Sequence, residues 1–105
     1  MGSYVDRFER MVADALGSKN AVAVVNGTSA LQIALLVAGV EPDDEVLVST
    51  LTFIAPVNAI RYVGAWPVFI DAESAHWQMD AEKVVEFLDR ECHWKQGALR
   101  NSKTG

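Results

Sequence analysis

The stretch from residue 21 to residue 40 constrains the fold most, because it carries no charged side chain. It has about the length that a membrane-spanning helix requires. However, it contains Asn26-Gly27, a dipeptide typical of turns, followed by two hydroxyl residues. The interruption predicts three elements in place of one span: a buried strand at 21–25, a polar turn, and a buried helix at 29–38.

Hydrophobic periodicity predicts the other elements. They are a helix at 4–16, a strand at 45–49, a helix at 54–63, a strand at 66–70 and a helix at 81–90. Alternating helices and strands predict an α/β fold with a mostly parallel sheet. Periodicity fades near the end, so residues 92–105 are expected to form an irregular tail. Three parallel strands leave faces and edges uncovered, so we expect residues 1–105 to be part of a larger domain.

Charge and cysteine content exclude several functions. The net charge is -5, which disfavours a nucleic acid or an anionic membrane as partner. The only cysteine, Cys92, cannot form an internal disulfide, and no secretory signal is visible, so we expect a cytoplasmic protein. Apart from Cys92, which is adjacent to His93, the two histidines His76 and His93 have no nearby acid or cysteine at metal-ligand spacing, and we expect no metal.

Two loops at predicted strand ends carry the candidate functional residues. Gly27 allows a close turn after the first strand, and Thr28 and Ser29 then open a helix, whose N-terminus suits an anion such as phosphate. An ordinary helix cap explains the same residues without a ligand. Phe53 follows the second strand and could stack on a flat ring, or it could be a core aromatic. Ligands of open α/β sheets bind beyond such strand ends.

Four segments in this order resemble the beginning of the DegT/DnrJ/StrS sugar aminotransferases. The segments are Tyr4-Val5-Asp6-Arg7-Phe8-Glu9, Ala21 to Leu31, Thr52-Phe53-Ile54-Ala55 and Pro67-Val68-Phe69-Ile70-Asp71. Members of this family are pyridoxal-phosphate (PLP) enzymes of fold type I. The resemblance implies a three-layer α/β/α large domain, of which this chain would hold the N-terminal part.

The resemblance also implies roles for individual residues. Gly27, Thr28 and Ser29 would bind the PLP phosphate, and Phe53 would stack on the pyridine ring. The lysine that forms the Schiff base with PLP, and the aspartate that pairs with the pyridinium nitrogen, would lie downstream of this chain. No catalytic residue is therefore expected here, and the chain alone should be inactive.

The family resemblance further implies a homodimer that moves an amino group from glutamate to a nucleotide-linked keto-sugar for polysaccharide biosynthesis. Residues 91–105 resemble an insertion of a subgroup that makes bacillosamine or legionaminic acid precursors, whose substrate is a UDP-linked 4-keto-6-deoxy-N-acetylhexosamine. Two alternatives stay open: a PLP-dependent sugar dehydratase of the same family, and a nucleotide-binding α/β module without PLP chemistry.

Overall fold

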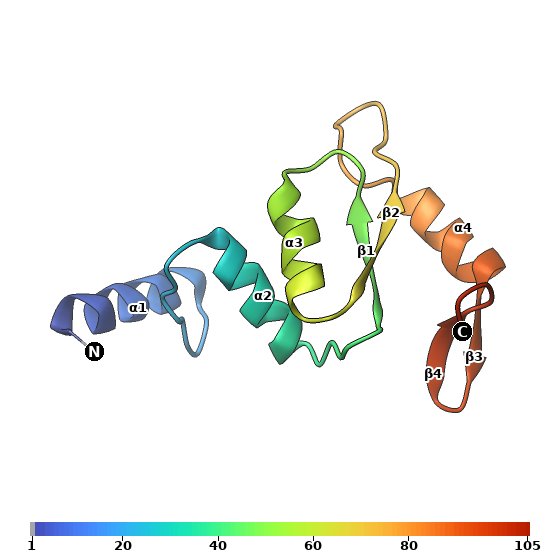
Figure 1. The fold of residues 1–105 in the computed structure, drawn as a ribbon. Coiled ribbons are helices and arrows are strands. Elements are labelled where there is room, and N and C mark those ends of the chain that lie inside the picture. Colours follow the sequence, from blue (N-terminus) through green and yellow to red (C-terminus); the bar gives the residue numbers. More distant parts are fainter. Residues whose placement is uncertain (1) are drawn as a thin grey trace.

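The computed structural model describes residues 2–105 and contains four helices and four strands within them (Figure 1). In chain order these are α1 (Ser3–Leu16), α2 (Gly27–Val37), β1 (Glu45–Ser49), α3 (Ile54–Tyr62), β2 (Trp66–Ile70), α4 (Ala81–Glu91), β3 (Cys92–Lys95) and β4 (Ala98–Asn101). The two central strands have the predicted bounds, and all four helices lie where periodicity predicts them, to within two residues at each end.

The core forms where α3 packs on the strand pair β1–β2. The strands are parallel neighbours, with Glu45 opposite Trp66 and Ser49 opposite Ile70, as the alternation of elements predicts. The buried core residues at this junction are Val48, Ile60, Val63 and Ala65. Leu35 of α2 packs against them, so α3 lies between α2 and the strands (Figure 1). This packing fixes α2 and α3 as neighbours.

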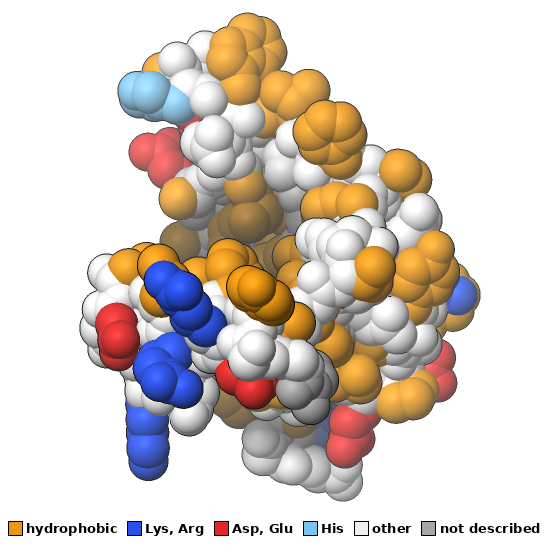
Figure 2. Space-filling view, turned by 90° about the vertical axis from the view of Figure 1, so that its left-hand side faces the viewer, with side chains coloured by type: hydrophobic (Ala, Val, Ile, Leu, Met, Phe, Trp, Pro, Cys, Tyr) orange, Lys and Arg blue, Asp and Glu red, His pale blue; other side chains and the backbone are white. Residues whose placement is uncertain are grey.

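Helix α1 stands at one end of the molecule (Figure 1). It ends at Gly17, whose φ of 63° is the left-handed conformation that glycine adopts readily. The Ser18 N–H closes the end by donating to the Ala13 carbonyl at 2.9 Å. Tyr4, Phe8 and Met11 of this helix are exposed. Figure 2, which faces this end of the molecule, shows apolar side chains spread widely over the surface.

The predicted strand at 21–25 is wrong for the described residues: this segment has no regular secondary structure. The run of β-branched residues favours an extended chain, but a strand also needs a neighbour to complete its backbone hydrogen bonds. No strand within residues 2–105 lies beside it. The Ala23 N–H instead donates to the Glu9 carboxylate at 2.7 Å.

The expected irregular tail at 92–105 is also wrong, because β3 and β4 form an antiparallel hairpin there. A two-residue turn joins the strands, with φ values of 53° at Gln96 and 80° at Gly97. Two positive φ values belong to the hairpin turn that twists with its strands, and Asn-Gly is its usual sequence. The hairpin is tied to β1 because Glu45 accepts hydrogen bonds from Asn101 at 2.9 Å and Thr104 at 2.7 Å.

Candidate functional site

A hollow of about 620 Å³ lies where the start of α2 meets the start of α3; we call it the α2–α3 hollow. Its lining comes from the first two turns of α2, the loop before α3 and the first turn of α3. The lining residues are Gly27, Thr28, Ala30, Leu31, Ala34, Thr52, Phe53, Ala55 and Pro56. Three of the four predicted site residues, Gly27, Thr28 and Phe53, thus border the same hollow, although Phe53 is far from the other two in sequence.

The first turn of α2 has free backbone donors at two residues that line this hollow. The Asn26 side chain caps the helix, and its Oδ1 accepts from the Ser29 N–H at 2.9 Å. The Ala30 N–H donates to the Asn26 carbonyl at 3.1 Å. Within residues 2–105, the N–H groups of Gly27 and Thr28 have no such acceptor, and both residues line the hollow. Free amides and the positive end of the helix dipole together favour an anion at this position.

Ser29 differs from its two neighbours. It does not line the α2–α3 hollow, and its backbone N–H is already taken by Asn26. The structure therefore shows the ordinary helix cap, and the two free N–H groups are those that the first turn of any helix leaves unpaired. The role of Ser29 at a phosphate stays a prediction.

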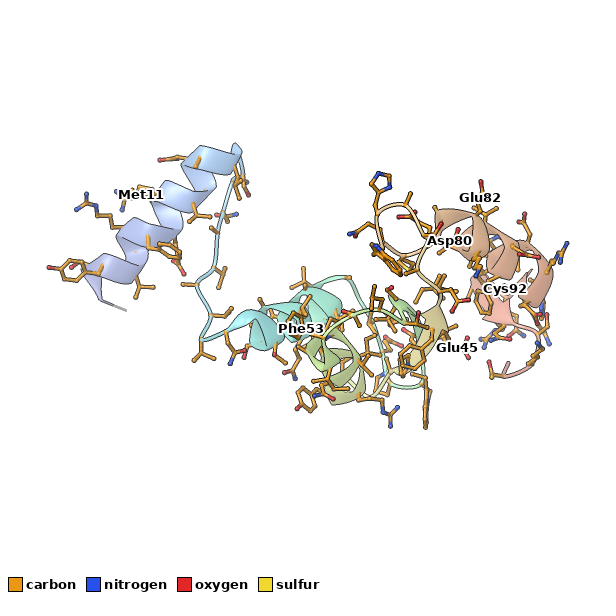
Figure 3. All side chains as sticks on the ribbon, turned by 90° about the horizontal axis from the view of Figure 1, so that it is seen from above. Met11, Glu45, Phe53, Asp80, Glu82 and Cys92 are labelled. Atoms are coloured by element: carbon orange, nitrogen blue, oxygen red, sulfur yellow. The ribbon has the colours of Figure 1, made fainter. Side chains whose placement is uncertain are left out.

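Phe53 occupies the position before α3 and borders the same hollow. Its residue surface is 86% exposed, so it is not a core aromatic of this chain. Its loop follows β1 directly, and the Thr50 N–H donates to the Ile70 carbonyl at 2.9 Å, which ties the loop to the end of β2. Figure 3 shows Phe53 beside α2, and Cys92 and Glu45 toward the other end of the molecule. An exposed aromatic face at a hollow can stack on a flat ring.

Neither Asp71 nor any of the four lysines borders the α2–α3 hollow. The Lys83 ammonium donates to Asp71 Oδ2 at 2.8 Å, and this hydrogen bond raises the pKa of Lys83. A raised pKa keeps an amine protonated, whereas a Schiff base forms from a neutral amine. Lys103 pairs with Glu91 at 2.8 Å. Lys83 and Lys103 are therefore engaged elsewhere on the surface.

A second hollow of about 750 Å³ lies between the β3–β4 hairpin and the start of β1, and the sequence patterns did not indicate it. Three consecutive acidic residues, Asp43, Asp44 and Glu45, line it. These acids outnumber the one cation of the lining, Arg100, which donates to the Gly105 carbonyl, so this larger hollow disfavours a phosphate. Ligands of open α/β sheets bind beyond the carboxyl ends of the strands, and this hollow is at the opposite end of β1.

None of the helices within residues 2–105 combines the length and hydropathy needed to cross a bilayer. No group of three or more His, Cys, Asp or Glu side chains in that part of the chain is arranged to hold a metal ion.

This chain matches a known protein family in sequence. The model of the DegT/DnrJ/EryC1/StrS aminotransferase family matches residues 1–93. GDP-perosamine synthase from Escherichia coli O157:H7 is 46% identical over 85 residues, which are 81% of this chain and 23% of that protein.

Solved structures agree with the sequence match. Spr1654 from Streptococcus pneumoniae in its PLP form has a TM-score of 0.77 and 30% identity, over 82% of this chain and 22% of that one. The NtdA structure from Bacillus subtilis, with bound cofactor PMP, has a TM-score of 0.79 and 31% identity, over 82% of this chain and 20% of that one.

The chain thus spans less than a quarter of the length of these three relatives. Its fold is the corresponding part of fold type I of the PLP-dependent enzymes, which confirms the predicted fold class. By sequence match and by structure, the chain belongs to the DegT/DnrJ/EryC1/StrS aminotransferase family.

Proposed function

We propose that the protein carrying this chain is a PLP-dependent aminotransferase that acts on a nucleotide-linked keto-sugar. Within it, this chain supplies the phosphate contacts and the ring platform of the cofactor site. Family membership supports the reaction class, and the bound PLP and PMP of the two structural relatives support the cofactor. The single observation that carries the proposal is the convergence of Gly27, Thr28 and Phe53 on one hollow.

The residues of the α2–α3 hollow fit PLP in their chemistry. A phosphate needs several donors, and the N–H groups of Gly27 and Thr28 and the Thr28 hydroxyl provide them. A pyridine ring needs a flat apolar partner, which the exposed Phe53 side chain provides. Bound PLP supplies the electron sink that lets an amino group be exchanged between a donor and a carbonyl. In this proposal, Gly27, Thr28 and Phe53 bind the cofactor and hold it in one orientation.

The remaining catalytic groups are proposed to lie outside this chain. No lysine borders the α2–α3 hollow, so the Schiff-base lysine and the aspartate at the pyridinium nitrogen are assigned to another part of the protein. We also propose a cytoplasmic homodimer, as the family resemblance implies. The single cysteine is in keeping with a reducing compartment.

We propose one amino donor and two candidate sugar acceptors. The donor is glutamate, and the acceptor is a UDP-linked 4-keto-6-deoxy-N-acetylhexosamine. A GDP-linked keto-sugar is the second candidate, because three relatives that are 42–46% identical to this chain are GDP-perosamine synthases. Both acceptors belong to one reaction class and differ in the nucleotide and in the sugar ring.

Absorbance and product analysis of the intact protein test this proposal. Addition of PLP should give a bound-cofactor absorbance band, and glutamate should then remove that band. Mass spectrometry should next detect an amino sugar after addition of either the UDP-linked or the GDP-linked keto-sugar. A protein that binds nucleotides but gives no band with PLP would support the nucleotide-binding module instead. Loss of a sugar hydroxyl without gain of nitrogen would indicate the dehydratase.

A further inference from the structure

Residues 17–26 connect α1 to the turn at Gly27 and Thr28 without a helix or strand. Segments of this kind lack the hydrogen-bond ladders that hold helices and strands in place. Val22 and Val25 within it are largely exposed, whereas Ala21, Ala23 and Val24 are half-buried, so packing in this chain fixes the segment only in part. Within residues 2–105, the position of the Gly27 and Thr28 amides therefore depends also on the hydrogen bonds that hold this connection.

One hydrogen bond from α1 holds this connection. Glu9 of α1 accepts a hydrogen bond from the Ala23 N–H at 2.7 Å, and both residues are half-buried. Within residues 2–105 it is the only hydrogen bond or ion pair between α1 and any residue beyond Asn20. The other acidic residues of α1, Asp6 and Asp14, are exposed and their side chains accept no hydrogen bond in the same part of the chain.

A second fixed point follows three residues later along the chain. Asn26 is held by its own side chain, which caps α2 through the Ser29 N–H. Between the two fixed points lie only Val24 and Val25, and directly after the cap come the free amides of Gly27 and Thr28. The Glu9 contact thus restricts the direction from which the chain enters the turn.

We propose that Glu9 is a positioning residue for the cofactor phosphate: through the Ala23 N–H it holds the turn in the geometry in which the amides of Gly27 and Thr28 converge on one anion. This inference rests on the proposed function, because it takes the anion to be the phosphate of PLP. Glu9 itself touches neither phosphate nor ring in this assignment.

The expected effect is confined to the phosphate. Without the Glu9 contact the connection samples more conformations, and the apparent affinity falls with the fraction of molecules in which the turn is competent. Phe53 belongs to the loop after β1, which is held separately through the Thr50–Ile70 hydrogen bond. Ring binding should therefore persist when phosphate binding weakens.

The experiment compares two ligands, PLP and pyridoxal, which differ only in the phosphate. Dissociation constants are measured by absorbance titration on the intact apo-protein, with thermal unfolding recorded for each variant. Glu9→Ala should weaken PLP binding roughly tenfold, with pyridoxal binding changed less than about twofold. Glu9→Asp should behave in the same way, because its shorter side chain falls short of Ala23. Glu9→Gln should restore most of the loss, since its amide oxygen still accepts a hydrogen bond.

Two control variants make the outcomes distinct. Asp14→Ala removes an exposed carboxylate from the same helix and should leave both affinities unchanged. Thr28→Val tests the phosphate site directly and should weaken PLP alone. If Thr28→Val is selective for PLP while Glu9→Ala and Glu9→Asp are not, the positioning role is wrong and the proposed function stands. If Glu9→Ala does not fold, Glu9→Asp and Glu9→Gln decide the question. Equal affinity of the unaltered protein for PLP and pyridoxal would overturn the phosphate site and the role of Glu9 together.

Discussion

At the scale of single residues, the four predicted site residues do not behave alike. Two hydroxyl residues at the start of a helix predict an anion site, and sequence alone gives them equal weight. The structure separates them, because Asn26 caps the helix through the Ser29 N–H and leaves the N–H groups of Gly27 and Thr28 free. Which amide a capping side chain takes depends on its rotamer, and the sequence does not contain that information.

Thr28 and Ser29 should therefore differ in their effect on PLP binding. In the intact protein, Thr28→Val removes a hydroxyl from the α2–α3 hollow and should weaken PLP binding by about 1.5–3 kcal/mol, as expected for a hydrogen bond to a charged group. Ser29→Ala should weaken it less, because Ser29 does not line the α2–α3 hollow. Absorbance titration measures both. A larger loss for Ser29→Ala would mean that its hydroxyl turns into the site when the cofactor binds.

Phe53 should matter for the ring and little for stability. Its side chain is exposed in this chain, so Phe53→Ala removes few contacts of the fold. Stacking contributes about 0.5–1.5 kcal/mol beyond buried area, and both PLP and pyridoxal binding should weaken by at least that amount. Phe53→Tyr keeps the ring and serves as the matched control. If Phe53→Ala lowers the melting temperature but leaves both affinities intact, the residue packs against another part of the protein and not against the cofactor.

At the scale of secondary-structure elements, local signals predicted the helices and the two central strands. Gly17 ends α1, and Asp80 caps α4 by accepting from the N–H groups of Glu82 and Lys83. These are local interactions that the sequence specifies by itself. The prediction of a strand at 21–25 was wrong because a strand needs a neighbouring strand to pair with, and β-branched composition alone does not supply one. The hairpin was missed because Gln96-Gly97 is a weaker turn signal than Asn-Gly.

Cys92, the first residue of the hairpin, lies in an environment that disfavours its thiolate form. Burial raises the pKa of the Cys92 thiol, and the negative charges of Glu45 and Glu91 raise it further. Only the thiolate is alkylated, so the rate of reaction with iodoacetamide should rise at higher pH than for an ordinary cysteine. Glu45→Gln removes one negative charge and should move the rate profile toward lower pH, although not fully, because burial remains.

Glu82→Gln is the control for this measurement. Glu82 is an exposed acid of α4 and does not contribute to the pKa shift of Cys92. The Glu82→Gln profile should overlay that of the unaltered protein. If Glu45→Gln also overlays it, the charge of Glu45 has no influence on the thiol.

At the scale of the whole molecule, many large apolar side chains are exposed. The hydrophobic core is small, and Val25 and Val37 are 87% and 83% exposed. Each large apolar side chain that stays exposed forgoes about 1.5–3 kcal/mol of burial. The relatives are more than three times as long as this chain, and in them further chain is available to cover such a surface.

The 105-residue chain expressed alone should therefore self-associate. Exposed apolar patches and open strand edges favour contacts between copies. Sedimentation velocity should show species larger than the 11.5 kDa monomer, in a proportion that rises with protein concentration. A single monomeric species with a sharp thermal transition would contradict this prediction.

The β1–α3–β2 unit has a consequence for the order in which the chain acquires structure. Its two strands pair across only 21 residues of sequence, from Glu45 to Trp66, and its helix lies between them in the chain. This unit holds the buried core and its loops are short, so within the α/β layer it should form first and should be the last part to open. The phosphate turn, held by Glu9 and Asn26, would become ordered later. Amide hydrogen exchange on the intact protein should then show slow exchange in β1 and β2 and fast exchange at Gly27 and Thr28, with PLP slowing only the latter pair. The cofactor would thus complete a turn on a scaffold that is already folded.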